Sequence, residues 1–168
     1  MENSPEHFKN LTLCSINLSG ISIGNEKVLR CILDSFSSMK NASEKICFEI
    51  TETAAIADID VAIKFMMQLR KHGFRFSLDD FGSGLSSFFY LKKLPIDYVK
   101  IDGLFVKNMD SDKVNYMMVK AITEVSHAMG KQVIAEYVEN EIIRDCLNEI
   151  GVDFAQGYYY AKPELITL

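Results

Sequence analysis

The chain has 168 residues, of which 48% are hydrophobic and 24% charged, and its formal net charge is −5 at pH 7. This composition is typical of a single soluble globular domain, and the negative charge disfavours non-specific binding of a nucleic-acid polymer through long-range repulsion. No apolar run reaches the roughly 18 residues of a membrane span and the first residues are too polar for a secretory signal, so we expect no membrane segment and a cytoplasmic location.

Short apolar runs rich in strand formers alternate with amphipathic segments along the chain, which is typical of βα units that feed a parallel sheet. Residues 1–10 are polar, and we expect them to be disordered or frayed. The expected strands are residues 11–16, 45–50, 74–78, 98–101, 132–135 and 153–155. The expected helices are residues 27–39, 58–71, 86–93, 112–129 and 140–150.

Six expected βα units leave two architectures open. A closed α/β barrel has eight strands and takes about 250 residues. A dinucleotide-binding sheet is disfavoured, because no Gly-x-Gly-x-x-Gly follows the first expected strand. The chain is therefore either an open α/β sheet or an α/β barrel that lacks two units.

The cysteines lie far apart in the sequence, with no Cys-x-x-Cys pair and no Cys/His spacing of a zinc site. This spacing favours small buried hydrophobic side chains over a disulfide framework or a zinc centre. The residues concerned are Cys14, Cys31, Cys47 and Cys146.

Side chains able to bind a metal ion or a phosphate follow each expected strand, and the catalytic residues of α/β barrels lie at this carboxyl rim. A rim this acidic would repel itself unless cations lay among the carboxylates. Oxygen ligands without His or Cys favour Mg²⁺ or Mn²⁺ over Zn²⁺. The strand-end residues are Asn17, Glu49, Glu52, Asp79, Asp80, Lys100, Asp102, Glu136, Glu139 and Gln156.

Such a rim suits metal-assisted hydrolysis of a phosphodiester, because a cation lowers the pKa of a bound water and neutralises charge on the phosphoryl oxygens. Lys100 would add a fixed positive charge. Two alternatives concern the Asp-Asp-Phe-Gly-Ser-Gly segment at 79–84. It could be only a glycine-rich turn, whereas a kinase Asp-Phe-Gly motif is rejected because the other kinase motifs are absent.

A set of motifs in fixed order, spanning Leu13 to Pro163, resembles the EAL domain of bacterial cyclic di-GMP phosphodiesterases. The motifs are Asn-Leu-Ser, Glu-Ile-Thr-Glu, Leu-Asp-Asp-Phe-Gly-Ser-Gly, Leu-Pro-Ile-Asp-Tyr-Val-Lys-Ile-Asp, Ala-Glu-x-Val-Glu and Gln-Gly-Tyr. The resemblance implies a TIM-like (β/α) barrel, incomplete here, with residues 11–168 forming an EAL domain that lacks its first two units. It also implies hydrolysis of cyclic di-GMP to linear pGpG with one or two Mg²⁺ or Mn²⁺ ions, and a homodimer.

The resemblance assigns roles residue by residue. It makes Lys100 a contact of the attacking water and the metal site, and it places Gln156 near the scissile phosphate. The catalytic groups would be Lys100, Glu136 and Asp79, and the substrate-binding ones Gln156 and Asp80. Glu52 would anchor the loop 81–87, Asp102 would be a partner of Lys100, and Glu139 would be structural. The implied metal ligands are Asn17, Glu49, Asp79, Asp80 and Glu136.

Two features depart from the family pattern. The Glu-Ala-Leu tripeptide, whose glutamate is a metal ligand in the family, occurs nowhere in the sequence, and Tyr137 stands where the family usually has glycine. Activity of this chain alone is therefore in doubt. The rival function is a catalytically inactive EAL-like module that binds cyclic di-GMP or a protein partner, and a third is an unrelated Mg²⁺-dependent barrel enzyme acting on a phosphorylated metabolite.

Overall fold

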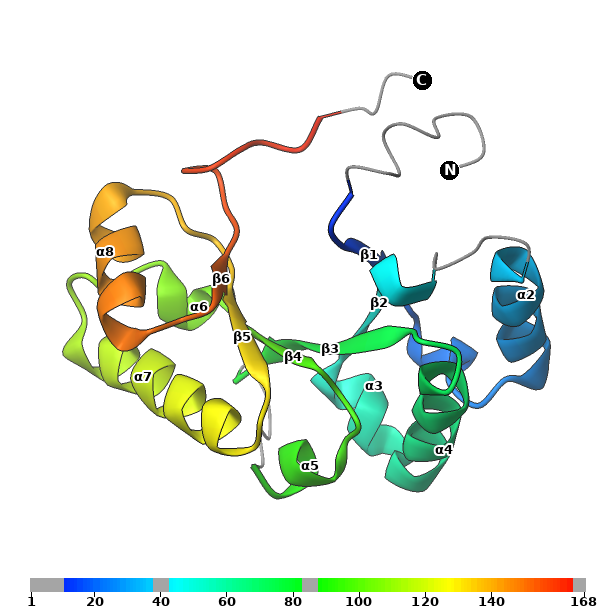
Figure 1. Ribbon diagram of the computed structural model, residues 1–168. Helices are drawn as coiled ribbons and strands as arrows, with labels where there is room; N and C mark the ends of the chain where they lie inside the picture. Colours follow the sequence, from blue (N-terminus) through cyan, green and yellow to red (C-terminus); the bar gives the residue numbers. More distant parts are fainter. Residues whose placement is uncertain (1–10, 38–42, 83–87, 165–168) are drawn as a thin grey trace.

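The computed structural model describes residues 11–37, 43–82 and 88–164, which form one curled parallel sheet (Figure 1). All six strands pair in chain order, so each crossover leads to the adjacent strand and the sheet curls as part of a barrel. Each strand overlaps one of the strands expected from the sequence, which confirms the α/β class and resolves the open alternatives in favour of an incomplete barrel. The strands are β1 (Cys14–Asn17), β2 (Ile46–Thr51), β3 (Arg75–Phe81), β4 (Tyr98–Ile101), β5 (Gln132–Ala135) and β6 (Phe154–Ala155).

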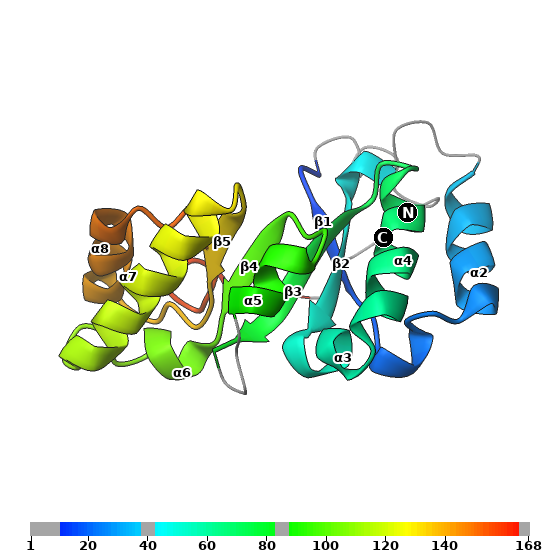
Figure 2. The same cartoon turned by 90° about the horizontal axis from the view of Figure 1, so that it is seen from below.

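The helices lie along the outer face of the curled sheet (Figure 1), with α2 and α4 over one half and α7 and α8 over the other (Figure 2). The longer ones begin where the sequence predicts, because an Asn or Asp side chain accepts hydrogen bonds from the first backbone N–H groups. The helices are η1 (Gly20–Ser22), α2 (Glu26–Phe36), η2 (Ser43–Lys45), α3 (Glu52–Ala57), α4 (Ile59–Arg70), α5 (Phe88–Lys93), α6 (Gly103–Val106), α7 (Lys113–Ala128) and α8 (Glu141–Ile150).

The hydrophobic core lies between the sheet and these helices. In β2 every residue from Ile46 to Ile50 is buried, as expected for a parallel strand covered on both sides. Phe76 and Leu78 of β3 pack in the same core as Met66 and Leu69 of α4. Burial of this apolar surface is the main force that holds the strand ends in fixed positions.

The two outer strands differ from the central ones. Among the described residues β1 pairs only with β2, and β6 pairs only with β5. Neither outer strand contains a fully buried residue. The sheet therefore has two partly exposed edges in the part of the chain that the structure describes.

The cysteines do not all behave as expected. Cys47 is buried in β2, whereas Cys31 is exposed, so the expectation of burial is wrong there. Cys31 lies in the amphipathic helix α2, of which one face is directed to solvent. In the described residues no helix combines the length and the apolar character needed to cross a membrane.

Candidate active site

The carboxyl ends of the strands surround one pocket of about 760 Å³. Because neighbouring parallel strands end on the same side, side chains far apart in the sequence meet there. Strand-end residues predicted from the sequence line this pocket together: Asn17, Glu49, Asp79, Asp80, Lys100, Glu136, Glu139 and Gln156.

Lys100 of β4 occupies the centre of the predicted set. Its Nζ lies 3.0 Å from Glu49 Oε2, 2.9 Å from Asp79 Oδ1 and 2.8 Å from Glu136 Oε1. All three carboxylates come from different strands or strand ends, and the side chain of Lys100 is only 5% exposed. One ammonium group therefore links β2, β3 and the end of β5 at the rim.

A bulge in β3 explains how two consecutive aspartates reach the same site. Leu78 pairs with Val99 and Phe81 with Ile101, so β3 has one residue more than β4 over this stretch. Side chains normally alternate between the two faces of a strand, and an extra residue breaks that alternation. Asp80 has a positive φ of 55° within this bulged stretch, and its N–H donates to Asp79 Oδ1 at 3.1 Å.

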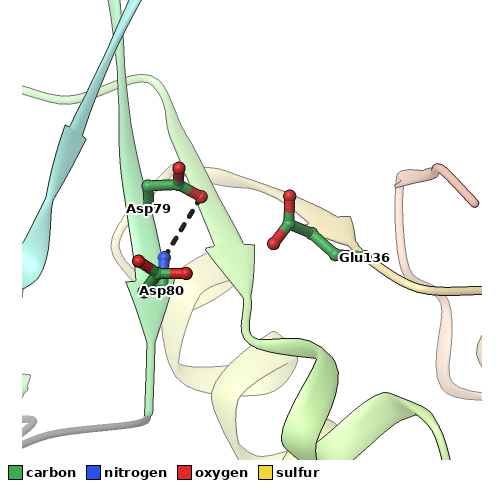
Figure 3. Close-up of side chains that lie close together, drawn as sticks. All are labelled: Asp79, Asp80 and Glu136. Carbon is green, nitrogen blue, oxygen red and sulfur yellow. Dashed lines mark hydrogen bonds between the residues drawn. The ribbon is translucent and has the colours of Figure 1, made fainter. Parts of the chain in front are cut away.

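Three carboxylates form a cluster suited to a metal ion. Asp79 and Glu136 point toward each other from β3 and from the end of β5, with Asp80 beside Asp79 (Figure 3). One ligand oxygen from each of the three lies within 4.8 Å of the others. Such an all-oxygen set fits a hard divalent cation such as Mg²⁺ or Mn²⁺.

Electrostatic effects in the pocket follow from burial and from this crowding of charge. Burial alone lowers the pKa of Lys100, but hydrogen bonds to Glu136 and Asp79 outweigh it and raise that pKa above its usual value. Burial raises the pKa of Glu136, and Lys100 opposes the rise. Burial and the neighbouring charge of Asp79 raise the pKa of Asp80. The ammonium thus stays charged at neutral pH, and the carboxylates depend on a nearby cation.

Gln156 reaches the cluster from the end of β6. Its Nε2 donates to Glu136 Oε1 at 2.8 Å, the same oxygen that Lys100 contacts. Its backbone is fixed on both sides, because its N–H donates to Ala135 O at 2.9 Å and its carbonyl accepts from Val138 N at 3.1 Å. Gln156 therefore orients Glu136 in this structure.

Two strand-end residues lie away from the pocket. The expectation that Asp102 is a partner of Lys100 is wrong, because Asp102 instead caps α6 and accepts from Leu104 N at 2.8 Å. Glu52 is the buried first residue of α3. Most of the loop 81–87 that Glu52 is expected to anchor lies outside the described residues, so this role stays a prediction.

Part of the pocket was not anticipated from the sequence. Residues of the segment 157–163, including Tyr158 and Lys162, form one wall of it. The motif match extends to Pro163 and could have indicated this wall, but no residue of 157–163 is acidic, so the strand-end rule did not select it. Tyr137 also lines the pocket, and its ring packs against Gly103 of α6.

The fold is that of an α/β barrel, and its carboxyl rim carries an acidic cluster that could hold a metal ion. The EAL domain family matches residues 2–163, and the chain belongs to that family. It is 48% identical over 150 residues to cyclic di-GMP phosphodiesterase PdeB of Shewanella oneidensis and 36% identical over 152 residues to cyclic di-GMP phosphodiesterase PdeA of Borreliella burgdorferi.

The matches cover most of this chain but a small part of the relatives. They span 89% and 90% of this chain, and 18% and 23% of PdeB and PdeA. Among solved structures, the PaMucR phosphodiesterase in complex with c-di-GMP superposes with a TM-score of 0.82 at 30% identity. That superposition covers 92% of this chain and 62% of the other, which confirms the EAL-type fold.

Proposed function

We propose that the chain forms the catalytic rim of a metal-dependent phosphodiesterase that hydrolyses cyclic di-GMP to linear pGpG. The observation that carries this proposal is the buried Lys100 ammonium within 3.0 Å of Glu49, Asp79 and Glu136, beside Asp80, in a pocket of about 760 Å³. The names of the relatives PdeB and PdeA support the same substrate.

The cation in this proposal is Mg²⁺ or Mn²⁺. Asp79, Asp80 and Glu136 would hold it, with Glu49 and Asn17 as further oxygen ligands lining the same pocket. When bound, such an ion lowers the pKa of a water molecule and neutralises charge on phosphoryl oxygens. The donor set contains no sulfur or imidazole, which favours these ions over zinc.

The side chains then have separate roles. Lys100 supplies a fixed positive charge for the phosphate oxygens and keeps three carboxylates in place. Glu136 accepts a proton at a carboxylate oxygen, since burial has raised its pKa toward the range useful for proton transfer. Gln156 orients Glu136 through its 2.8 Å hydrogen bond, and by the family resemblance it would contact the scissile phosphate. Water adds across one P–O ester bond, and the ring opens to the linear dinucleotide.

A binding module without turnover is the second candidate. The absence of Glu-Ala-Leu from the printed sequence favours it, because the resemblance makes that glutamate a metal ligand. The silent module would bind cyclic di-GMP in the same pocket but leave it intact.

Product analysis separates the two candidates. The 168-residue chain and the longest chain that its reading frame encodes are each incubated with cyclic di-GMP and Mn²⁺, and the nucleotides are resolved by chromatography. Conversion to pGpG supports the enzyme. Cyclic di-GMP retained by equilibrium dialysis but unconverted by both chains supports the silent module and contradicts the enzyme.

The assignment of residues 11–168 to an EAL domain lacking its first two units stays a prediction, as does the homodimer. The cytoplasmic location stays a prediction as well.

A further inference from the structure

Tyr137 adopts a backbone conformation that side chains rarely take. Its φ is +55°, and among the described residues other than glycine only Asp80 shares a positive φ. The left-handed region is unfavourable for an L-residue because Cβ approaches the carbonyl oxygen. Such a conformation persists only where surrounding contacts hold it.

The ring of Tyr137 provides those contacts. A Cβ atom placed on Gly103 would lie 2.2 Å from Tyr137 Cδ2, so the ring rests directly against that glycine. Lys107 Nζ lies 4.1 Å from the ring centroid, within the range of a cation–π contact. Gly103 is the first residue of α6, and Lys107, one helical turn later, directly follows the helix. The ring can therefore lie flat against α6, because Gly103 has no side chain in the way.

The chain on both sides of Tyr137 is fixed as well. Val138 is fully buried, its N–H donates to Gln156 O at 3.1 Å, and its carbonyl accepts from Tyr159 N at 3.0 Å. On the other side, Glu136 lies 2.8 Å from Lys100 Nζ and from Gln156 Nε2. The left-handed turn at Tyr137 therefore lies directly between the held Val138 backbone and the Glu136 carboxylate of the cluster.

We propose that Tyr137 is a positioning residue whose ring, seated on Gly103 and beside Lys107, holds the left-handed turn that keeps the Glu136 carboxylate in the acidic cluster. The inference rests on the proposed function, because Glu136 is there a metal ligand and proton acceptor. The positioning role also gives a reason for the large ring of Tyr137 at a position where the family usually has glycine. A glycine adopts this φ without help, whereas tyrosine needs the seat on α6.

Three substitutions at this position separate the ring from the backbone. Tyr137→Ala keeps the unfavourable φ and loses the ring, so we expect Mn²⁺ to bind roughly tenfold more weakly, as for the loss of a residue that orients a ligand. Tyr137→Phe keeps the ring contacts and Tyr137→Gly removes the need for them, so both should bind Mn²⁺ nearly as the parent does. Isothermal titration of the 168-residue chain with Mn²⁺ measures all three.

A change on the opposite side of the contact gives a sharper test. Gly103→Ala displaces the ring and should weaken Mn²⁺ binding by a similar factor in the parent. The same change should have little effect in the Tyr137→Gly variant, where no ring remains to be displaced. Leu104→Ala, at a neighbouring position of α6 that is 66% exposed, is the matched control and should be neutral.

The outcomes separate this inference from the proposed function. Equal Mn²⁺ affinity of Tyr137→Ala and the parent, or an effect of Gly103→Ala that is the same in both backgrounds, overturns the positioning role even if the parent hydrolyses cyclic di-GMP. Dependence of the Gly103→Ala effect on Tyr137 supports it even if no hydrolysis is found. A parent chain that binds no Mn²⁺ overturns the positioning role, whereas the proposed function is decided separately by conversion of cyclic di-GMP to pGpG.

Discussion

At the level of single residues, Lys100 and Glu136 carry the largest predicted effects. In the proposed reaction Lys100 and Glu136 both act where charge develops as water attacks the phosphodiester. Lys100→Ala and Glu136→Gln should therefore each reduce turnover of cyclic di-GMP by roughly 10²-fold. Glu139→Gln is the matched control, because Glu139 lines the pocket but is exposed and has no predicted part in the chemistry. Steady-state rates with circular dichroism as a folding check measure the three variants. A larger loss in Glu139→Gln than in Glu136→Gln would contradict the assignment.

Gly157 lies so close to the backbone of Val138 that no residue type with a side chain fits at this position. A Cβ atom there would lie 2.3 Å from the backbone N and O of Val138. Because backbone cannot move aside easily, Gly157→Ala should lower the free energy of unfolding by about 3 kcal/mol, at the upper end of overpacking effects. Urea unfolding measures the change.

Gly20→Ala serves as the control for that substitution. A Cβ atom on Gly20 would lie 3.2 Å from Ala54 Cβ and 3.8 Å from Ala54 Cα, both longer than the 2.3 Å contacts at Gly157, so the free energy of unfolding should fall by much less. Equal effects at Gly20 and Gly157 would show that the contact with Val138 is not the cause.

At the level of elements, α8 supports one wall of the pocket. Arg144 donates to Tyr159 Oη at 2.6 Å, and Tyr159 lies in the segment 157–163 that lines the pocket. Loss of a partly exposed hydrogen bond is worth about 1 kcal/mol or less. Arg144→Ala should therefore raise KM for cyclic di-GMP about threefold and leave kcat unchanged, which initial rates over a range of substrate concentrations would measure.

Arg30→Ala is the matched control for Arg144. Arg30 lies on α2 and pairs with Glu26 at 3.8 Å, with both side chains largely exposed and outside the pocket. We expect no change in KM. If Arg144→Ala also leaves KM unchanged, then α8 does not support the pocket wall.

The elements also show what could be predicted from the sequence. The strands and the long helices follow from apolar periodicity and from capping residues such as Asp58 and Asp112, and the strand-end rule brought the acidic residues together. The short helices α3 and α6 were missed because each is too short to show a period. Asp102 was misassigned for the same reason, since its cap belongs to α6.

Other features of the site could not be read from local pattern. The bulge in β3 depends on pairing with β4, which is a tertiary property. The contact between the Tyr137 ring and Gly103 brings together the segments that follow β5 and β4, which are distant in sequence. No motif within either segment indicates this contact. The wall at 157–163 likewise forms only when β6 pairs with β5.

For the whole molecule, the open edges of the sheet predict self-association of the 168-residue chain. β1 and β6 each have one unpaired side among the described residues, and unpaired backbone groups seek a partner strand. A second copy could supply it as a two-fold dimer. Light scattering at micromolar concentration should give a mass above that of the 19.0 kDa monomer.

A lysine introduced on the edge strand β1 tests whether edge pairing causes the self-association. Ser15 is an exposed residue of β1, and Ser15→Lys should shift the chain toward the monomer because an edge lysine opposes pairing. Ser35→Lys makes the same change on α2, away from the edge, and should not. A monodisperse monomer for the parent chain would contradict the prediction.

The dependence of cyclic di-GMP hydrolysis on the divalent cation tests the central claim most directly. Rates are measured on the longest chain that the reading frame encodes, with Mg²⁺ or Mn²⁺ titrated, with Ca²⁺ in their place, and in excess chelator. We expect turnover with Mg²⁺ or Mn²⁺, none in chelator, and inhibition by Ca²⁺, because Ca²⁺ prefers longer bonds and more ligands than this oxygen cluster provides for a smaller ion. Turnover at the full rate in excess chelator would contradict the account.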